Sequence, residues 1–163
     1  MKTKNTAMMV AFGGVIAALY VVLTWIANLM GLASGAIQVR LSEALTILPV
    51  FTVTAIPGLT VGCVLGNLLT GCAAWDVVFG SLATLLGAVG TRLLRNRPLL
   101  AWIPPVVSNA VIVPIVLIKV YGVPDAWWYL VLTVGAGEII ACGLLGLLLW
   151  RALRDHPLIR KMH

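Results

Sequence analysis

The sequence predicts an all-α membrane protein with six transmembrane helices, and two observations support that prediction. The chain of 163 residues has a mean hydropathy of +1.08 and is 61% hydrophobic but only 10% charged, which is not the composition of a soluble domain. Its apolar residues also form long segments, and a helix needs about 17–25 such residues to cross a bilayer. We therefore expect a single transmembrane domain over residues 1–163 and no soluble catalytic domain in this chain.

The apolar segments define the expected spans, which are 7–30, 44–56, 58–72, 77–94, 101–119 and 127–150. The second and third spans meet at Pro57-Gly58, which is either a tight turn between two spans or a kink in one broken helix. The turn is favoured because it gives an even number of spans. The first segment follows two lysines, as in a signal peptide, but its apolar run is too long, so we expect it to remain in the protein.

Basic residues indicate the orientation. With six spans both termini lie on one side of the membrane, and nine of the eleven basic residues lie on that side. Only Arg40 and Lys119 lie on the other side. Cytoplasmic loops carry such an excess of Lys and Arg, so both termini are expected to be cytoplasmic. The net charge of +6 then reflects topology and contact with anionic lipid, and does not indicate nucleic-acid binding.

The stretch 35–49 contains a group of polar and charged residues, although the segments around it are apolar. It carries Gln38, Arg40, Ser42 and Glu43 within six residues. Charges beside lipid are costly, so those found at or inside spans usually bind a substrate or an ion. The alternative is that Arg40 and Glu43 pair with each other at the lipid boundary.

Other spans contribute polar side chains to an expected pocket that opens outward. Glu138 lies about 16 Å into the last span, and a carboxylate there must be neutral, paired or in contact with a polar ligand. Asn67 and Asn109 either contact that ligand or tie helices together. Asp76, at the outer end of a span, either contacts the ligand or caps its helix. Trp128 either anchors the chain at the membrane surface or stacks on a planar ligand.

The first span carries a stripe of small residues that allows close helix packing. The stripe consists of Ala7, Ala11, Gly14 and Ala18. It packs either against another helix of this chain or against a partner membrane protein. No phosphate-binding loop, zinc-protease motif or nucleophile elbow occurs, and both histidines lie outside the spans. We therefore expect no enzymatic activity, no metal site and no cofactor, and a carrier of this kind needs a partner or an ion gradient for energy.

Several of these residues stand in blocks that resemble the QueT family. The most specific blocks are IQVRLSEALT at 37–46 and DVVFGSLATL at 76–85, and shorter ones occur at 18–24, 55–59, 62–63, 104–110 and 137–138. The resemblance covers about residues 7 to 150. QueT proteins are the queuosine-precursor substrate-binding subunits, or S components, of energy-coupling factor (ECF) transporters. The resemblance therefore implies an S-component-like bundle in a prokaryotic cell membrane.

The resemblance also implies a ligand and partners. The ligand would be a 7-deazaguanine, such as its 7-cyano or 7-aminomethyl derivative, or the base queuine, captured from outside. The partners would be a transmembrane coupling protein, met by the small-residue stripe of the first span, and two ATPase subunits. No specific binding residue is implied by the family itself.

The chemistry of such a ligand agrees with the polar residues. A guanine-type edge offers an N–H and an amino group that one carboxylate accepts together, so Glu138 or Glu43 is expected to bind it. Its carbonyl and ring nitrogens need donors, which amides or Arg40 supply. The remaining contacts are expected from Gln38, Asn67 and Asn109, with Asp76 near an aminomethyl group.

Other functions stay open from the residues alone. One is an autonomous proton-coupled carrier of small solutes in which Glu138 relays the proton. The sequence suggests no second acid or histidine near the depth of Glu138, which counts against that carrier. The others are an S component for another vitamin and a scaffold without a ligand.

Overall fold

The structure is a computed structural model that describes residues 2–32 and 38–156. These residues form helices and turns without a strand, so the expected all-helical class is confirmed. The elements in chain order are α1 (Lys2–Leu29), η1 (Leu41–Val50), α2 (Ala55–Leu69), α3 (Ala74–Leu93), η2 (Pro98–Leu100), α4 (Ile103–Lys119), α5 (Trp127–Glu138), η3 (Ile139–Leu145) and α6 (Gly146–Leu153). The elements η1 and η2 are 3-10 helices, and η3 is a π-helical segment.

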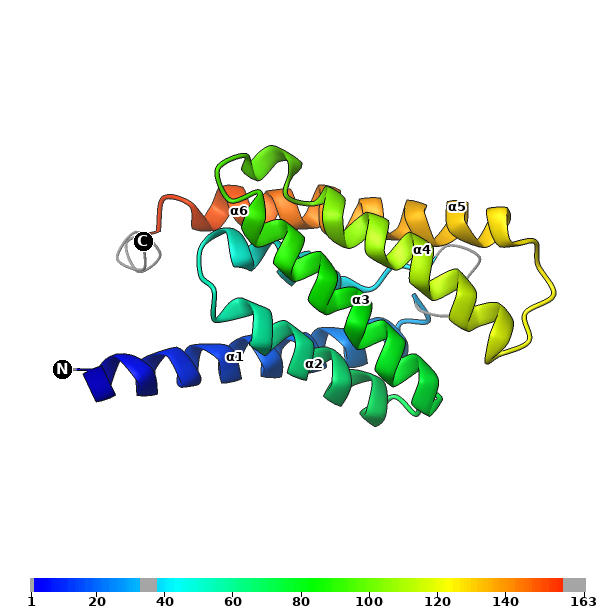
Figure 1. The fold of residues 1–163 in the computed structure, drawn as a ribbon, viewed down its shortest axis with the longest axis horizontal. Helices are drawn as coiled ribbons and strands as arrows, with labels where there is room; N and C mark the ends of the chain where they lie inside the picture. The colour runs from blue at the N-terminus through cyan, green and yellow to red at the C-terminus, as the bar shows by residue number, and fades with distance from the viewer. Residues whose placement is uncertain (1, 33–37, 157–163) are drawn as a thin grey trace.

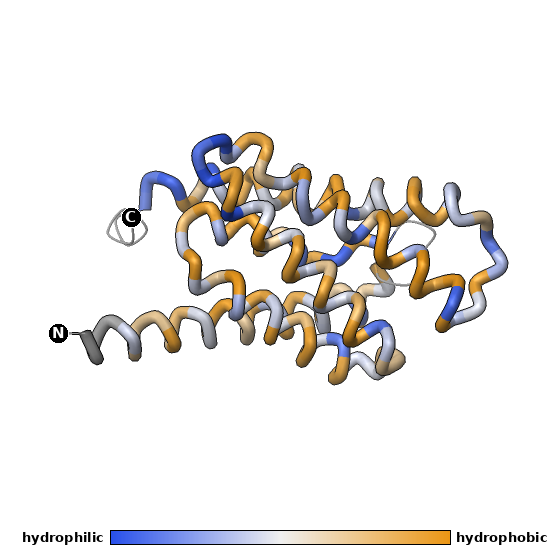
Figure 2. The backbone as a smooth tube through the Cα atoms, viewed as in Figure 1, coloured by the Kyte–Doolittle hydropathy of each residue, from blue (hydrophilic) through white to orange (hydrophobic). Residues whose placement is uncertain are grey.

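Successive segments run in alternate directions, so both ends of the described chain lie at one end of the bundle (Figure 1). We call this the terminal end, and it also holds residues 51–54 and 94–102. The opposite end holds residues 70–73 and 120–126, and we call it the cavity end. Hydrophilic segments gather near the two ends, while the helices between them are mostly hydrophobic (Figure 2).

Four helical segments are long and apolar enough to cross a membrane, judged by length and composition. They are Thr6–Leu29, Ala74–Leu93, Pro98–Lys119 and Trp127–Leu153, and they correspond to the first and the last three expected spans. The expected spans 44–56 and 58–72 are instead the shorter apolar helices Leu41–Val50 and Ala55–Leu69.

The break between these two shorter helices lies at 51–54, so the prediction of a turn at Pro57-Gly58 is wrong. Pro57 lies in the first turn of α2, where a missing N–H costs no helical hydrogen bond. Gly58 serves close packing instead. A Cβ atom at this position would lie 2.7 Å from the carbonyl oxygen of Gly13, so α1 and α2 are in contact there.

The helix η1 lies inside the bundle, packed against α1, α3 and α6. A 3-10 helix rises about 2 Å per residue, so its 10 residues span roughly 20 Å. All but two of its side chains are buried. At its end Arg92 Nη1 donates hydrogen bonds to the carbonyl oxygens of Pro49 (3.0 Å) and Val50 (3.3 Å), which a helix end otherwise leaves unpaired. The segment that carries Glu43 is therefore shielded by other helices.

The last expected span, 127–150, is one helical segment with a π-helical insertion in its middle. The insertion, η3, begins directly after Glu138. Such π-helical segments interrupt α-helices most often at functional sites, because they widen the helix and redirect its side chains. Here the widened part carries Cys142 against η1.

Candidate substrate-binding site

A cavity of about 320 Å³ lies at the cavity end. It is formed by α1, α2, α3, α4, the loop after α4, and the segment 38–40 that leads into η1. Four of the expected site residues line it, namely Gln38, Arg40, Asn67 and Asp76. A second cavity of about 230 Å³ adjoins it and shares Gln38 as a lining residue. The structure thus brings these four residues together around one space.

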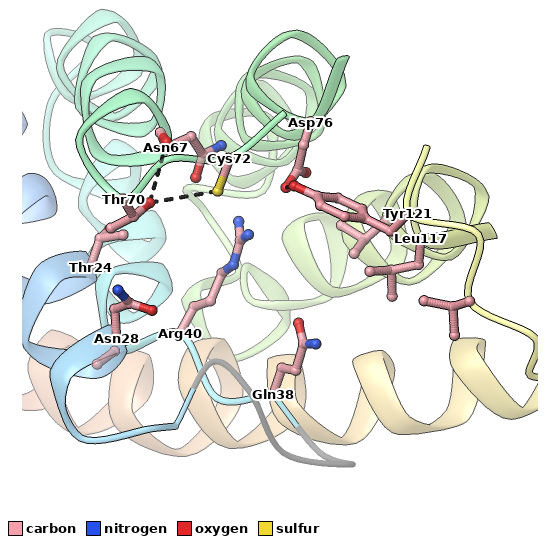
Figure 3. A pocket seen from close by; sticks show the side chains of 13 residues that line it. Thr24, Asn28, Gln38, Arg40, Asn67, Thr70, Cys72, Asp76, Leu117 and Tyr121 are labelled. Carbon is pink, nitrogen blue, oxygen red and sulfur yellow. Dashed lines mark hydrogen bonds between the residues drawn. The ribbon is translucent and has the colours of Figure 1, made fainter. Parts of the chain in front are cut away.

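Arg40 directs its guanidinium into this cavity, toward the side of Asn67 and Asp76 (Figure 3). Among the described residues the guanidinium forms no ion pair, since the one salt bridge found joins Arg154 to Asp155 (3.1 Å). The alternative in which Arg40 simply pairs with Glu43 is therefore not what the structure contains. An arginine without a partner inside a cavity offers up to five N–H donors to a ligand.

Asp76 lies at the cavity rim and is buried at 7% exposure. Its Oδ2 accepts a hydrogen bond of 3.0 Å from the hydroxyl of Tyr121, and that hydroxyl accepts one of 3.1 Å from the backbone N–H of Ala73. No side-chain cap is found at the start of α3, so the helix-capping alternative for Asp76 is not observed. Tyr121 instead ties the loop after α4 to α3 beside the cavity.

Asn67 contributes its amide from α2 and is 1% exposed. Its Nδ2 lies 3.6 Å from the Sγ of Cys63, a weak contact. Gly80 of α3 faces this amide, since a Cβ atom there would lie 3.1 Å from Nδ2. The missing side chain at Gly80 therefore makes room for Asn67 at the cavity wall.

The other expected acids form a second group, the buried acid cluster, defined as Glu43, Glu138 and Cys142. Their carboxylate oxygens and thiol sulfur all lie within 4.8 Å of one another, and all three are buried. Tyr20 donates a hydrogen bond to Oε1 of Glu43. Cys142 donates to Oε2 of Glu138 at 3.3 Å. Asn109 of α4, 3% exposed, lies beside both carboxylates.

This cluster lies about one helical turn deeper than the cavity. On α1, Tyr20 precedes the cavity residue Thr24 by four positions, and on α4, Asn109 precedes Val113 by four. Arg40 is the basic side chain whose charge acts on both carboxylates as well as on Asp76. It lines the cavity and is also within electrostatic range of the buried acid cluster.

One oxygen of the cluster is left without a partner. Glu43 is 1% exposed, and its Oε2 has no hydrogen-bond partner among the described residues. A buried acceptor without a partner is costly and calls for a proton, an ion or a ligand. The three donor atoms also meet the distance requirement for a metal ion, but the Cys142 thiol already bonds Glu138 and lies 3.4 Å from the donating hydroxyl of Thr46.

The depth of Glu43 is a correction. The expected span 44–56 begins directly after Glu43, which put this residue at the outer end of a span, and the sequence suggested no second acid near the depth of Glu138. The structure places the two carboxylates side by side. The reason is the position of η1, which runs inside the bundle and carries Glu43 inward.

Comparison with known proteins identifies the family. The model of the QueT transporter family matches residues 10–155. The chain belongs to this family. A role in transport implies a function other than catalysis, and the several apolar helices fit a multi-pass membrane protein.

A curated relative of this QueT family member is the "Queuosine precursor transporter QueT" of Lactococcus lactis subsp. cremoris (strain MG1363). The two chains are 40% identical over 73 residues, which is 44% of this chain and 42% of the relative. The matched region thus spans less than half of the relative's length. No solved structure matches the chain.

The small-residue stripe of this QueT family member lies on the side of α1 where Gly14 borders an apolar hollow shared with Pro57 and Gly58 of α2. Its four residues, Ala7, Ala11, Gly14 and Ala18, are all exposed, and a Cβ atom at Gly14 would meet nothing within 4 Å. The contact between α1 and α2 uses a different face of α1, where Gly62 of α2 packs against Ala17 and Tyr20. Packing within the chain therefore does not account for the stripe.

Trp128 lies outside both cavities and is 63% exposed. Three other exposed tryptophans also lie toward the cavity end of the bundle. They are found near the end of α1 and at the starts of α3 and α5. Tryptophans gather in this way where helices meet the membrane surface. The placement of Trp128 thus fits the anchoring alternative and not ligand stacking.

Sequence reasoning missed three functional neighbours of the site, namely Tyr20, Thr24 and Tyr121. Thr24 lines the cavity and donates a hydrogen bond of 2.9 Å to Ser42, at the start of η1. Tyr20 and Thr24 stand four residues apart and hence share a face of α1, which is a pattern visible in the sequence. Nothing in the sequence placed that face against 40–43, because helix rotation depends on tertiary packing.

Proposed function

We propose that this chain is the S component of an ECF-type importer and that it binds a 7-deazaguanine precursor of queuosine. In this proposal residues 1–163 form one transmembrane domain with six membrane-embedded segments, and both termini face the cytoplasm of a prokaryotic cell. The segments η1 and α2 are shorter than the bilayer core of about 30 Å. The burial of η1 among longer helices supports counting it as embedded, because irregular backbone survives at membrane depth only when protein covers it. The apolar exposed face of α2, with Val61 and Leu65, supports counting this helix as embedded too.

The unpartnered guanidinium of Arg40 inside a cavity of about 320 Å³ is the observation that carries the proposal. A cationic donor held in a cavity next to Asn67 and Asp76 suits a small, flat, polar ligand with both acceptors and donors. A deazapurine has that character. Its carbonyl oxygen accepts from Arg40, while the amides of Gln38 and Asn67 complete the hydrogen bonds.

The buried acid cluster suits the other edge of the same ligand. The guanine-type edge carries an N–H and an amino group, and the free Oε2 of Glu43 accepts one of these while Glu138 accepts the other. In this proposal Arg40 moves aside as the ligand enters, because among the described residues no ion pair holds it. Asp76 at the rim takes the end that bears an aminomethyl group. Analogues without matching donors would leave these buried acceptors unpaired, and that penalty provides selectivity.

Thermal-shift measurements on the solubilised protein test the ligand. The panel consists of 7-cyano-7-deazaguanine, 7-aminomethyl-7-deazaguanine, queuine, guanine and riboflavin. A ligand that binds only the folded state raises the unfolding temperature by mass action. We expect the deazaguanines to stabilise the protein without ATP, and stabilisation by riboflavin alone overturns the deazapurine assignment in favour of an S component for another vitamin.

Three variants test the residues. Arg40→Gln, Glu43→Gln and Glu138→Gln are each expected to weaken binding of the best deazaguanine by at least about tenfold, the effect of losing one charge-assisted hydrogen bond. Lys119→Gln is the matched control, since Lys119 is exposed, also lies near the cavity end and lines neither cavity. Unchanged affinity in both glutamate variants contradicts the proposed recognition of the guanine-type edge.

The partners in this proposal are a transmembrane coupling protein and two ATPase subunits. The chain has no phosphate-binding loop of its own, so uptake against a gradient needs an external source of energy. The exposed stripe of Ala7, Ala11, Gly14 and Ala18 is the proposed contact with the coupling protein, because small residues let helix backbones approach closely.

The neighbouring carboxylates favour one second candidate, an autonomous proton-coupled carrier. Glu43 and Glu138 place carboxylate oxygens within 4.8 Å of each other, an arrangement of two neighbouring acids that the sequence did not suggest. That carrier predicts accumulation of a deazaguanine in liposomes that contain this chain alone, driven by a pH gradient. The S component predicts binding without accumulation under the same conditions, so one experiment separates the two functions.

A further inference from the structure

Gly137 of α5 stands directly before Glu138 and against the backbone of the cavity wall. A Cβ atom at this position would lie 1.9 Å from the carbonyl oxygen of Gln38 and 2.8 Å from its carbonyl carbon. Real Cβ atoms do not come closer than about 3 Å to such atoms, so the segment 38–40 lies where it does only because residue 137 has no side chain.

We infer that Gly137 is a positioning residue for the ligand site, because it seats the segment that carries Gln38 and Arg40. The ligand part of this inference rests on the proposed function. The close contact between Gly137 and the backbone of Gln38, which we call the seat, does not rest on it, since this contact concerns the fit of two backbone segments. Gly137 has no donor or acceptor that lines either cavity, so it acts through the two residues that it positions.

The other ties of the segment leave the α5 side to this contact. The N–H of Val39 donates to the carbonyl of Leu32 at 3.0 Å, and the carbonyl of Arg40 accepts from the N–H of Glu43 at 3.0 Å. Both bonds join the segment to its own neighbours in the chain. Among the described residues, the contact with Gly137 is thus the backbone contact that sets the distance of the segment from α5, and with it the reach of Gln38 and Arg40 into the cavity.

A methyl group at residue 137 would therefore move a backbone atom and not a flexible side-chain end. The distance of 1.9 Å has to increase by more than an ångström. We expect the segment 38–40 to move, because it is not helical, whereas Gly137 is held within α5. The side chains of Gln38 and Arg40 would leave their places in the cavity as the segment moves. Displacements of this size at binding groups are costly because hydrogen-bond energy falls steeply with geometry.

Gly137→Ala tests the inference, and Gly135→Ala is its matched control. The control lies two positions earlier on the same helix, where the new Cβ atom would be 3.8 Å from the Cβ of Ala110, an ordinary contact. We expect Gly137→Ala to weaken binding of 7-aminomethyl-7-deazaguanine by at least about tenfold and Gly135→Ala to leave it within about twofold. Equal affinities of the two variants overturn the inference.

A double-mutant cycle with Arg40→Gln separates positioning from general damage. If Gly137→Ala acts by moving Arg40, it causes little further loss in ligand affinity in a chain that has already lost this guanidinium. We expect the combined loss in affinity to be clearly smaller than the product of the two single losses. Full multiplication of the two effects shows that Gly137 acts through something other than Arg40, and it overturns that part of the inference.

Hydrogen exchange of the ligand-free protein tests the seat without any ligand. Gly137→Ala is expected to speed amide exchange at residues 39–43 relative to the wild type and to Gly135→Ala, because the segment loses its support. Unchanged exchange overturns the seat even if no deazapurine binds. If the wild type binds no member of the panel while exchange changes as expected, the proposed function fails and the seat stands.

A measurement on the wild type covers the case in which Gly137→Ala does not fold. Adding 7-aminomethyl-7-deazaguanine is then expected to slow exchange at residues 38–40 and at residues 136–138 together, since the two segments are in contact. Protection of one segment without the other overturns the inference.

Discussion

Tyr20 donates its hydroxyl hydrogen bond to the Glu43 carboxylate, joining the middle of α1 to the interior helix η1. Both side chains are 1% exposed. The bond satisfies one carboxylate oxygen and leaves Oε2 of Glu43 free. Because Glu43 also lies in the buried acid cluster with Glu138 and Cys142, the same residue serves both as a tie between helices and as an open acceptor in the bundle.

Tyr20→Phe removes the donor and leaves Glu43 with two unpaired oxygens. We expect a loss of about 1–3 kcal/mol in the free energy of unfolding, the cost of a buried polar group without its partner. Thermal unfolding of the solubilised protein measures this loss. Tyr129→Phe is the control, because Tyr129 is 39% exposed. A Tyr20→Phe protein as stable as the control contradicts a structural role for the bond.

Gly62→Ala should destabilise the contact between α1 and α2. The added Cβ atom would lie 2.7 Å from the Cβ of Tyr20 and 3.0 Å from the carbonyl oxygen of Ala17. Overpacking of this kind costs about 1–3 kcal/mol, which thermal unfolding detects. Gly14→Ala adds the same methyl group to open space and is expected to be neutral or slightly stabilising, since alanine favours helix. Similar melting temperatures for the two variants would falsify this packing argument.

Gly14→Leu should block docking without affecting the ligand. The new side chain would stand on the exposed stripe, in an apolar hollow that Gly14 shares with Pro57 and Gly58 of α2, and outside the two cavities of the ligand site. We expect co-purification with the proposed coupling protein to fall at least about tenfold, while affinity for the best deazaguanine stays that of the wild type. Undiminished co-purification places the partner elsewhere, and a loss of ligand affinity contradicts the separation of the two surfaces.

Tyr121→Phe should loosen the rim of the cavity. Burial raises the pKa of Tyr121 above its ordinary value of 10.0, and the hydrogen bond to Asp76 adds to this rise. The folded protein thus holds the phenolic proton more tightly than the unfolded chain does, so the stabilising effect is fully present below about pH 10 and is lost as the pH rises through the raised pKa.

We therefore expect Tyr121→Phe to cost about 0.5–1.5 kcal/mol in the free energy of unfolding, with the same cost at about pH 7 and at about pH 9. Thermal unfolding at the two pH values, compared with Tyr129→Phe, measures this. A cost that disappears between these pH values shows that the phenol already ionises there and contradicts the raised pKa.

The sequence predicted much of the helical pattern, because long apolar runs report burial and lipid contact directly. The four segments long enough to cross a membrane follow their predicted spans closely, as for Thr6–Leu29 against 7–30 and Pro98–Lys119 against 101–119. The prediction failed at Pro57-Gly58. Pro57 is tolerated in the first turn of α2, but in the sequence it has the same appearance as a helix-breaking proline. Its neighbour Gly58 allows close packing against Gly13 and does not form a turn.

The sequence by itself determined which residues are polar in an apolar chain, and therefore which ones to suspect. Gln38, Arg40, Asn67 and Asp76 do line one cavity. Within the stretch 35–49, residues 35–37 lie outside the described residues. Only the tertiary structure decided that Glu43 lies beside Glu138, that Arg40 forms no ion pair with the described residues, and that Trp128 lies away from the cavity. The physical reason is that hydropathy fixes which segments enter the membrane, whereas helix rotation and depth follow from close packing, at contacts such as Gly137 against Gln38, which no local pattern encodes.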